Sequence, residues 1–308
     1  MARISVGVPV YNGANYLQAA LASLLSQSFE DLEIIIADNA STDSTEQIAR
    51  EAAAADSRVS YHRHADNIGA AANFNFTLEQ SSSDYFMWSP HDDIRHPLFV
   101  ERALAAFNEN PAAASVFSRA ASIDSEGKQR RVMQRPDDLL SSDVAKRMRA
   151  TITSRHPGVI IFGLIRTSLL RRVGGQRTFP GGDRVLAADL AINGPFVELP
   201  EVMFFNRDHP ERYVQLKRSH GAAGRLLQEG WWVPHRAHRI TFPGWSQLGG
   251  YLQAIRQAPL TSGERMRCYA ALLAAATDQG GAIPRSLAGD LVTALVTATG
   301  KVAKRRVI

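Results

Sequence analysis

Short apolar segments and helical patterns alternate along residues 1–125, and this alternation constrains the fold more than any other feature of the chain. Ile4 to Val10 is apolar enough for a buried strand, and residues 16–27 then repeat apolar side chains at helical spacing. The predicted strands that follow are 32–37, 59–62, 85–88 and 114–123, and the predicted helices are 41–55, 70–79 and 97–108. Strands that alternate with helices predict an α/β fold with a mostly parallel, Rossmann-like sheet and helices on both faces.

The remainder of the chain shows a weaker and then a different pattern. Residues 124–157 are polar, with one predicted helix at 137–152. Short helices and strands are predicted after an apolar segment at 159–162, over residues 167–173, 184–192, 196–199 and 202–206. Beyond Tyr213 the strand pattern ends, and residues 262–276 and 285–302 predict helices. We therefore expect an α/β domain over residues 1–212 and a helical C-terminal region over residues 213–308 that binds the acceptor or mediates oligomer formation.

Composition excludes several classes of protein. Hydrophobic residues make up 45% and charged residues 21% of the 308 residues, which is typical of a globular chain and not of a disordered one. One cysteine, Cys268, rules out an intrachain disulfide or a cysteine metal cluster. A net charge of +5 is too small to indicate nucleic acid as a partner. Because no apolar run reaches ~18 residues, we expect no transmembrane segment. We expect a cytoplasmic protein, for which contact with the inner membrane surface and oligomer formation both stay open.

Polar side chains follow three of the predicted strands at the point where each strand ends. Tyr11 and Asn12 follow the first strand, Asp38 follows the second, and Asp92 and Asp93 follow the strand at 85–88. Ligands of parallel α/β sheets bind beyond the carboxyl ends of the strands, which places a site here. Adjacent carboxylates suit Mg²⁺ or Mn²⁺ that carries a substrate phosphate. The alternative for the acidic pair is a solvated cluster at the N-terminus of the next helix, where negative charge is favourable.

Two further segments offer contacts for a nucleotide, each with a structural alternative. Asp38 would accept a hydrogen bond from the imide of a uracil or thymine base; otherwise Ser41 and Asp43 simply cap the next helix. Residues 67–73, Asn-Ile-Gly-Ala-Ala-Ala-Asn, place small side chains at the start of a helix, so that a ligand can approach its exposed N–H groups. The alternative for this segment is a capped, alanine-rich helix.

Asp189 and His209 are the remaining candidates for chemistry. Asp189 is the only charged residue in the apolar segment 187–192. It would act as a general base toward an acceptor hydroxyl or pair structurally with an arginine such as Arg184. His209 follows a predicted strand and would ligate the same metal, contact a diphosphate, or be an ordinary loop residue.

An aromatic group and a basic C-terminal tail leave several roles open. The aromatic residues would fill the helical core, stack on a sugar or sit at a lipid headgroup surface, and we favour the core. The tail would be solvated or contact anionic lipid. The aromatic group is Trp231, Trp232, Trp245 and Tyr251, and the basic residues of the tail are Lys301, Lys304, Arg305 and Arg306.

Four motifs, taken in this order, resemble those of the inverting glycosyltransferases of family 2, which have the GT-A fold. The segment 9–12, Pro-Val-Tyr-Asn, resembles the first-strand motif, and 38–43, Asp-Asn-Ala-Ser-Thr-Asp, resembles the second-strand motif. Residues 67–73 are similar to the Asn-x-Gly helix opening of the family. Residues 89–93, Ser-Pro-His-Asp-Asp, resemble its Asp-x-Asp region. The match is good over residues 3–125 and loose over 158–212.

The resemblance implies a nonprocessive inverting glycosyltransferase that uses a UDP- or dTDP-linked sugar and Mn²⁺ or Mg²⁺. Tyr11 and Asp38 would hold the base, and Asp93 would ligate the metal with His209 nearby. Asp189 would deprotonate the acceptor hydroxyl, which attacks the anomeric carbon directly. The acceptor, whether a glycan, a glycolipid or a small molecule, stays open. The residues that the resemblance assigns to the nucleotide sugar are Pro9, Tyr11, Asn12, Asp38, Asn67, Gly69, Asn73 and Asp92.

The sequence departs from the family pattern at three points. Pro90 and His91 stand in the Asp-x-Asp region, so its first acid is absent, and Ala188 replaces the glutamate of the Glu-Asp motif that contains the base. The Gln-x-x-Arg-Trp motif of processive synthases is missing, which favours single transfers. Two alternatives stay open. One is a noncatalytic sugar- or nucleotide-binding module. The other is a nucleotidyltransferase, which would need a charged, glycine-rich loop that residues 11–16 do not provide.

Overall fold

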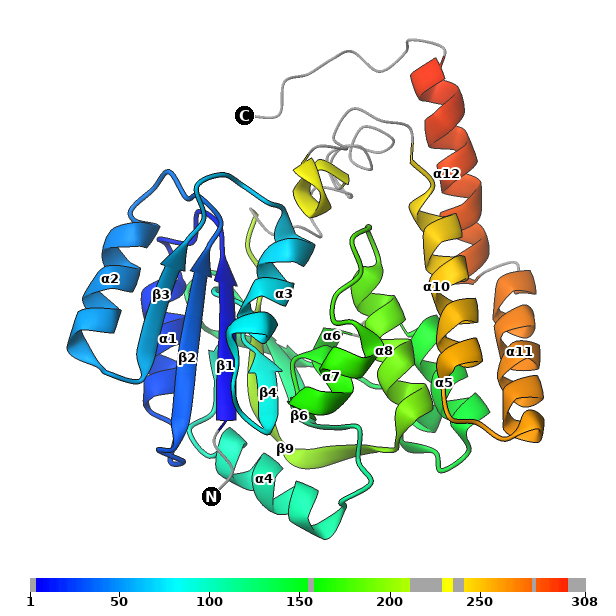
Figure 1. Ribbon diagram of the computed structural model, residues 1–308, viewed down its shortest axis with the longest axis horizontal. Helices are drawn as coiled ribbons and strands as arrows, with labels where there is room; N and C mark the ends of the chain where they lie inside the picture. Colours follow the sequence, from blue (N-terminus) through cyan, green and yellow to red (C-terminus); the bar gives the residue numbers. More distant parts are fainter. Residues whose placement is uncertain (1–3, 155–157, 211–228, 235–240, 279–280, 299–308) are drawn as a thin grey trace.

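The computed structural model describes residues 4–154, 158–210, 229–234, 241–278 and 281–298 of the chain (Figure 1). Within these residues, one nine-stranded mixed sheet lies between two layers of helices, and further helices stand beside it. The strand order is β3-β2-β1-β4-β8-β6-β9-β5, with β7 paired to β6. The strands are β1 (Ile4–Val10), β2 (Leu32–Asp38), β3 (Val59–Arg63), β4 (Tyr85–Trp88), β5 (Ile94–Arg95), β6 (Ser115–Ile123), β7 (Gln129–Val132), β8 (Leu164–Arg166) and β9 (Phe196–Arg207).

The first half of the sheet is parallel, as the alternating pattern predicts. Strand β1 pairs in parallel with both β2 and β4, and β2 pairs in parallel with β3. In the register of β1 with β2, Pro9 lies opposite Ala37 and Val10 lies opposite Asp38, so the two strands end together. The second half is mixed: β6 is parallel to β9, whereas β4–β8, β6–β8, β6–β7 and β5–β9 are antiparallel. The expected α/β fold with a mostly parallel sheet is therefore confirmed.

Helices cover the two faces of the sheet because each presents an apolar stripe to it. One hydrophobic cluster joins β1 and β2 to α1 (Leu17–Leu25), α2 (Thr45–Ala55) and α4 (Phe99–Glu109). A second cluster on the opposite face joins β4, β6 and β8 to several helices. Four of these helices are α3 (Ala70–Gln80), α6 (Gly158–Ile161), α7 (Thr167–Val173) and α8 (Gly182–Asn193).

The C-terminal helices pack on the first region through a third cluster. Here α10 (Pro243–Gln257), α11 (Ser262–Thr277) and α12 (Ala282–Ala298) contact α8 and α5 (Val144–Thr153). Tyr251 and Cys268 are buried in this cluster, and burial raises the pKa of the Cys268 thiol to about 11. Arg147 adds a polar link, because its Nε donates to Ala191 O over 2.8 Å. No helix in the part of the chain that the structure describes has the length and apolarity needed to span a membrane.

Several element boundaries differ from the sequence expectations for local reasons. Helix α2 begins at Thr45 rather than Ser41, because the Ser41 hydroxyl accepts a hydrogen bond from Asn12 N instead of capping a helix. The two strands expected near residues 196–206 are one strand, β9. The helix expected over residues 137–152 is a short 3-10 helix, Asp137–Leu140, followed by α5. The sequence also missed α10 and the strands β5, β7 and β8, which have two to four residues each, too few to show a period.

Candidate active site

The loops that follow β1 and β2 are joined by hydrogen bonds into one unit at the carboxyl edge of the sheet. Asn12 takes the left-handed conformation (φ 49°), and its N donates to Ser41 Oγ over 2.9 Å. Its Oδ1 accepts from Thr42 N over 2.8 Å. Gly13 N donates to Thr45 Oγ1 over 2.9 Å. These contacts hold the main chain beneath Tyr11, whose side chain is 40% exposed. Pro9, which the sequence analysis assigned to the nucleotide sugar, is buried within β1 just before this loop.

Asp38 lies beneath these loops with both of its oxygens engaged. Oδ1 accepts from Ser41 N over 2.8 Å, and Oδ2 accepts from the Tyr61 hydroxyl over 2.8 Å. Arg63 Nε lies 3.5 Å from Oδ2. Burial and the hydrogen bond to Asp38 raise the pKa of Tyr61. Asp38 is fully buried, and these contacts support the loop. Its contact with a nucleotide base stays a prediction.

The segment that opens α3 is braced by two buried asparagines. Asn39 donates from Nδ2 to Asn67 Oδ1 over 2.8 Å and accepts from Ile68 N over 2.8 Å. Asn73 donates to Ala37 O over 2.8 Å, which ties α3 to the end of β2. Gly69 has φ +87°, and a Cβ there would lie 2.4 Å from the carbonyl oxygen of Trp232. The structure thus brings the segment 67–73 to the same edge as the loops after β1 and β2.

Asp93 is engaged by the end of β9. It is 1% exposed, and its carboxylate accepts from Asn206 Nδ2 at 3.0 and 3.1 Å and from Arg207 N at 2.8 Å. Arg207 adds a second link between β9 and this loop, because its Nε donates to Asp92 O over 2.9 Å. Its guanidinium also lies 4.8 Å from the ring centroid of Tyr16. Asp93 therefore links β9 to the loop after β4. Its role as a metal ligand stays a prediction.

Asp92 and His209 lie in contact beside these links between β9 and the loop after β4. His209 Nε2 lies 3.0 Å from Asp92 Oδ2, and the His209 ring packs against Tyr16 with centroids 4.7 Å apart. The His209 side chain is buried, and its Nδ1 finds no hydrogen-bond partner among the described residues. A buried imidazole nitrogen without a partner beside a carboxylate has the chemistry of a metal ligand pair.

The donor set fits a divalent cation that also binds substrate. Within the described ranges, no group of three or more His, Cys, Asp or Glu side chains is arranged to hold a metal ion. Magnesium-like ions commonly take only one or two protein carboxylates and complete their shell with waters and substrate phosphates. The pair formed by Asp92 and His209 agrees with such a shared site.

Asp189 lies in the second half of α8 and is paired with an arginine. Arg177 Nη2 donates to Asp189 Oδ2 over 2.8 Å, and the Asp189 side chain is 5% exposed. Burial raises the pKa of Asp189 to about 6, although Arg177 acts to lower it. The partner is not Arg184, which instead donates to Ser154 O over 2.9 Å. Asp189 is thus buried and paired with Arg177, and its role as the base stays a prediction.

Asp183, in the first turn of α8, is a carboxylate that the sequence reasoning passed over. It is partly exposed, and burial raises its pKa more than Arg184 lowers it. The C-terminal end of α8 packs at Gly194 against Ala112 and Ala114, just before β6 begins. A helix of 12 residues is ~18 Å long, so α8 begins toward the carboxyl edge of the sheet. The available signal was an acid directly after Gly181 and Gly182, at the start of a predicted helix.

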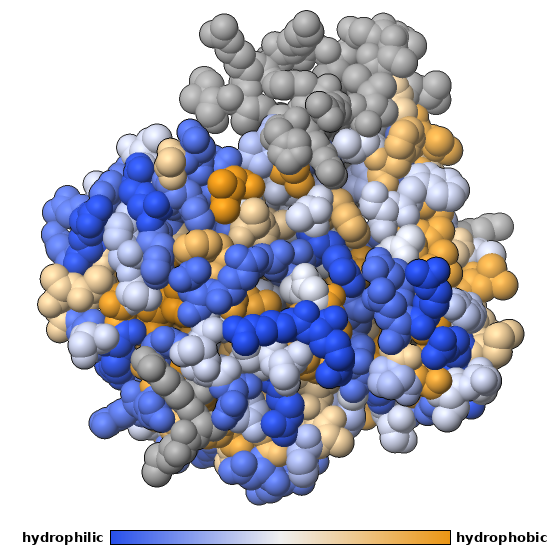
Figure 2. Space-filling model, viewed as in Figure 1, coloured by the Kyte–Doolittle hydropathy of each residue, from blue (hydrophilic) through white to orange (hydrophobic). Residues whose placement is uncertain are grey.

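The four aromatic residues of the C-terminal half do not form one cluster. Trp232 packs with Ala71 of α3, and Trp231 meets its ring edge-on at 5.4 Å. Tyr251 lies in the core between the C-terminal helices and α8, as expected. Trp245 is 51% exposed on α10. Figure 2 shows hydrophobic surface along the side of the molecule formed by α10 and α12. The core assignment is therefore right for Trp232 and Tyr251 only. The basic tail 301–306 lies outside the described residues.

Comparison with known proteins agrees with this architecture. The family profile described as glycosyl transferase family 2 matches residues 5–174. The chain therefore belongs to this family, and its structure has the GT-A fold with additional C-terminal helices.

Curated relatives share part of the chain. An uncharacterized glycosyltransferase of Rickettsia bellii is 32% identical over 141 residues, which cover 46% of this chain and 20% of that protein. The putative glycosyltransferase EpsE of Bacillus subtilis is 35% identical over 104 residues, which cover 33% of this chain and 37% of that protein. The chain thus spans roughly a fifth to a third of the length of such relatives.

Solved structures match over nearly the whole chain. S. aureus TarS 1-349 in complex with UDP has a TM-score of 0.56 at 16% identity, over 99% of this chain and 94% of that one. The mannosyltransferase PcManGT from Pyrobaculum calidifontis, in complex with GDP-Man and Mn²⁺, has a TM-score of 0.54 at 16% identity, over 98% and 88%. At this identity the likeness concerns the fold.

Proposed function

We propose that this protein is a nonprocessive, inverting glycosyltransferase that transfers a sugar from a nucleoside diphosphate sugar to an acceptor hydroxyl with the help of Mn²⁺ or Mg²⁺. The observation that carries the proposal is the contact between Asp92 and His209 at the carboxyl edge of the sheet, beside the joined loops after β1 and β2. The UDP, UDP-GlcNAc and GDP-Man bound to structural neighbours support a nucleotide sugar as donor.

The nucleotide would lie against the loops after β1 and β2. Tyr11 is exposed there and offers a ring for the base, while Asn12 and Asp38 hold the loop from within. Asn67, Gly69 and Asn73 would support the neighbouring wall through their contacts with Asn39, Trp232 and Ala37. We expect the donor to carry UDP or dTDP as its nucleotide.

Asp92 and His209 would hold the divalent ion. Asp93 would keep them in place through its hydrogen bonds with Asn206. A bound Mn²⁺ or Mg²⁺ supplies positive charge that stabilises the departing diphosphate. The chain contributes the placement of this charge, because Arg207 and Asp93 join the loop after β4 to the end of β9. That rigid connection keeps Asp92 and His209 together before any ligand binds.

The base would be Asp183, in place of the Asp189 expected from the sequence. Asp183 lies at the start of α8 toward the ligand-binding edge and is partly exposed there, which lets its carboxylate act as a general base. It would take the proton of the acceptor hydroxyl as that oxygen attacks the anomeric carbon. The nucleoside diphosphate would leave from the opposite side, which inverts the anomeric configuration.

One observation favours a second candidate function, a noncatalytic sugar- or nucleotide-binding module. Asp189 is buried against Arg177, as expected if it serves structure alone. The two candidates differ in turnover, because a binding module retains UDP affinity but does not release UDP from a UDP-sugar. A cytoplasmic location and contact with a membrane surface stay predictions from the sequence.

Calorimetry of the full chain with UDP, dTDP and GDP, with and without Mn²⁺, tests the proposal. We expect Mn²⁺-dependent binding that Asp92→Asn weakens at least ~10-fold, which corresponds to ~1.4 kcal/mol. Asp31→Asn is the matched control, since Asp31 is exposed and precedes β2, at the opposite edge of the sheet. Absence of nucleotide binding by the unmodified chain, or unchanged binding by Asp92→Asn, would overturn it.

A further inference from the structure

We propose that the end of the molecule at which ligands bind docks on an anionic lipid bilayer, through apolar side chains at the start of α10 and on α12. These side chains, called here the apolar rim, are each between 41% and 54% exposed, and they are Phe242, Trp245, Leu291 and Val292. Nucleotide binding does not depend on this docking, so the two properties can be lost separately.

The apolar rim occupies one end of a helix pair, because α12 caps the N-terminus of α10. The Asp290 side chain is buried, and its Oδ2 accepts from Gly244 N over 2.8 Å and from Trp245 N over 3.3 Å. Leu291 and Val292 directly follow Asp290 in the chain. They therefore lie within one helical turn of the contact that α12 makes with the residues around Trp245.

The apolar rim lies on the side of the molecule toward which β1 runs. Figure 1 shows that α10 begins on this side and that α12 extends past the start of α10. Gln247, four residues into α10, donates from Nε2 to Gly181 O over 3.3 Å, just before α8 begins. Because α8 begins toward the carboxyl edge of the sheet, the apolar rim lies beside the edge at which ligands bind.

A further exposed tryptophan lies at the same edge. Trp231 is 36% exposed, and its ring meets that of Trp232 edge-on with centroids 5.4 Å apart. Trp232 is held at the start of α3, where it packs on Ala71 and its carbonyl oxygen lies against Gly69. A tryptophan ring is apolar but carries an N–H donor, so it favours the boundary between hydrocarbon and water. Trp231 and Trp245 thus give this end of the molecule two side chains suited to a lipid headgroup layer.

The charge near the apolar rim is positive. The charged residues of α10 and α12 are Arg256, Arg285 and Asp290, of which the one acid is buried. The segments 211–228, 235–240 and 299–308 adjoin residues 229–234, the start of α10 and the end of α12 in the chain. Their sequences contain ten of the 35 Lys and Arg residues of the chain and one of its 30 acids.

This combination of charge and apolar surface selects the partner. Exposed tryptophan and aliphatic side chains beside an excess of basic residues bind bilayers that contain anionic lipid. A second copy of this chain would bring the same positive charge to the contact and would be repelled. An anionic bilayer is therefore the partner that the apolar rim fits, and the ligand-binding edge would face it.

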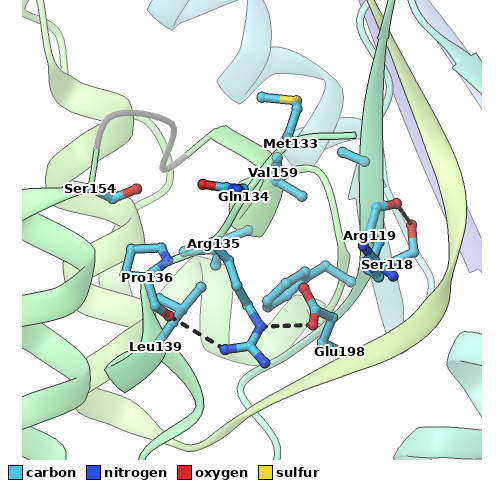
Figure 3. Close-up of a pocket in the computed structure, with 13 residues that line it drawn as sticks. Ser118, Arg119, Met133, Gln134, Arg135, Pro136, Leu139, Ser154, Val159 and Glu198 are labelled. Carbon is cyan, nitrogen blue, oxygen red and sulfur yellow. Dashed lines mark hydrogen bonds and ion pairs between the residues drawn. The ribbon is translucent and has the colours of Figure 1, made fainter. Parts of the chain in front are cut away.

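The cavity over β6 does not offer a comparable binding surface. Figure 3 shows Arg135 and Glu198 paired across it, with 2.8 Å between Arg135 Nε and Glu198 Oε2. Its volume of about 30 Å³ is close to that of one water molecule. The apolar rim, in contrast, presents four large apolar side chains to solvent.

Sedimentation of the full chain with lipid vesicles tests the docking. The probes are vesicles of phosphatidylcholine alone and vesicles of equal parts phosphatidylcholine and phosphatidylglycerol. We expect at least ~10-fold tighter binding to the anionic vesicles, and loss of this difference at ~1 M salt, where the Debye length is ~3 Å. Trp245→Glu and Val292→Glu should each weaken the binding ~10-fold or more, because each places a negative charge at the lipid surface. Both variants should keep the UDP affinity of the unmodified chain.

Met266→Glu is the matched control, because Met266 is 66% exposed on α11 at the other end of α10. Its neighbour Arg265 donates from Nη2 to Ala258 O over 3.1 Å, just after α10 ends. A helix of 15 residues separates that point from the start of α10 by ~22 Å. Met266→Glu is therefore expected to leave vesicle binding unchanged.

The possible outcomes separate the docking from the proposed function. Vesicle binding that is absent, or that Trp245→Glu, Val292→Glu and Met266→Glu change equally, would overturn the docking even if UDP still binds. Light scattering that shows a dimer in the absence of lipid, dissociated by Val292→Glu, would assign the apolar rim to a second copy of the chain and would also overturn it. Absence of UDP binding by an unmodified chain that still binds anionic vesicles would overturn the proposed function alone.

Discussion

His209 Nε2 lies 3.0 Å from Asp92 Oδ2, although 117 positions separate the two residues in the chain. The antiparallel pairing of β5 with β9 brings them together, because Ile94 lies opposite Phe205. The acidic pair that precedes β5 therefore runs alongside the residues that end β9. Asp93 completes the connection through its hydrogen bonds to Asn206 and to Arg207 N. Asp92 and His209 form the proposed metal-binding pair.

Replacing His209 is expected to weaken metal binding without unfolding the protein. His209→Gln removes the imidazole beside Asp92, so we expect the affinity for Mn²⁺ in the presence of UDP to fall ~10-fold or more. Electron paramagnetic resonance of free Mn²⁺ measures this affinity directly. His62→Gln, at a partly buried position of β3, serves as the control. Equal Mn²⁺ affinity in His209→Gln and the unmodified chain would exclude His209 as a ligand.

The two acidic residues of α8 are expected to differ in their effect on turnover. Asp183→Asn removes the proposed base, and we expect the rate of UDP release from a UDP-sugar in the presence of acceptor to fall roughly 10²–10⁴-fold. Asp189→Asn removes a carboxylate that is buried and paired with Arg177, and we expect UDP release within a few-fold of normal. UDP affinity should be retained in both variants. The reverse order of the two rates would restore Asp189 as the base.

The free energy of unfolding is expected to depend on pH through Asp189. Burial raises its pKa from an ordinary value of 3.8 to about 6 in the folded chain, so the folded state binds the proton more tightly. Stability from this group is therefore present at low pH and lost as pH rises through 6. Relative to Asp189→Asn, the unmodified chain should gain about 1.4 kcal/mol between pH 7.5 and pH 5.

Urea unfolding of both proteins at several pH values measures this difference. The comparison isolates Asp189, because the lowered pKa values of exposed acids such as Asp56 affect both chains alike. A difference in unfolding free energy that stays constant from pH 7.5 to pH 5 would show that the carboxyl titrates normally in the folded chain.

Two glycines are expected to respond oppositely to alanine. Gly69 has φ +87°, and its added Cβ would lie 2.4 Å from Trp232 O, so Gly69→Ala should destabilise the protein by about 1–3 kcal/mol. Gly249 lies within α10 with open space around its Cβ position. Gly249→Ala should stabilise by up to ~1 kcal/mol, because alanine favours helix. Thermal unfolding compares the two variants, and equal effects would mean that residue 69 relaxes without strain.

Local chemistry of the chain was sufficient to predict the framework of the site. The strand patterns place Asp38 and Asp92 after apolar strands, and parallel pairing puts those ends at one edge. The structure confirms this arrangement of the strands. It also shows the Asn67–Asn73 segment at the same edge, held by Asn39.

The different surroundings of aspartates that look alike in the sequence depend on contacts from distant segments of the chain. Asp92 and Asp93 are adjacent and of the same type. Because β9 packs beside them, Asp93 accepts hydrogen bonds from Asn206 whereas Asp92 lies beside His209. In α8, Asp189 stands out by its apolar surroundings in the sequence. The same burial lets Arg177 pair with it, whereas Asp183 lies at the helix start near the ligand-binding edge.

The sequence by itself determined the α/β framework, the family and the edge of the sheet at which ligands bind, because hydrophobic period and strand-end residues are local properties. The tertiary structure alone decided which carboxylate faces an imidazole and which one meets an arginine. These outcomes depend on distances between side chains far apart in the chain, and no local pattern encodes such distances.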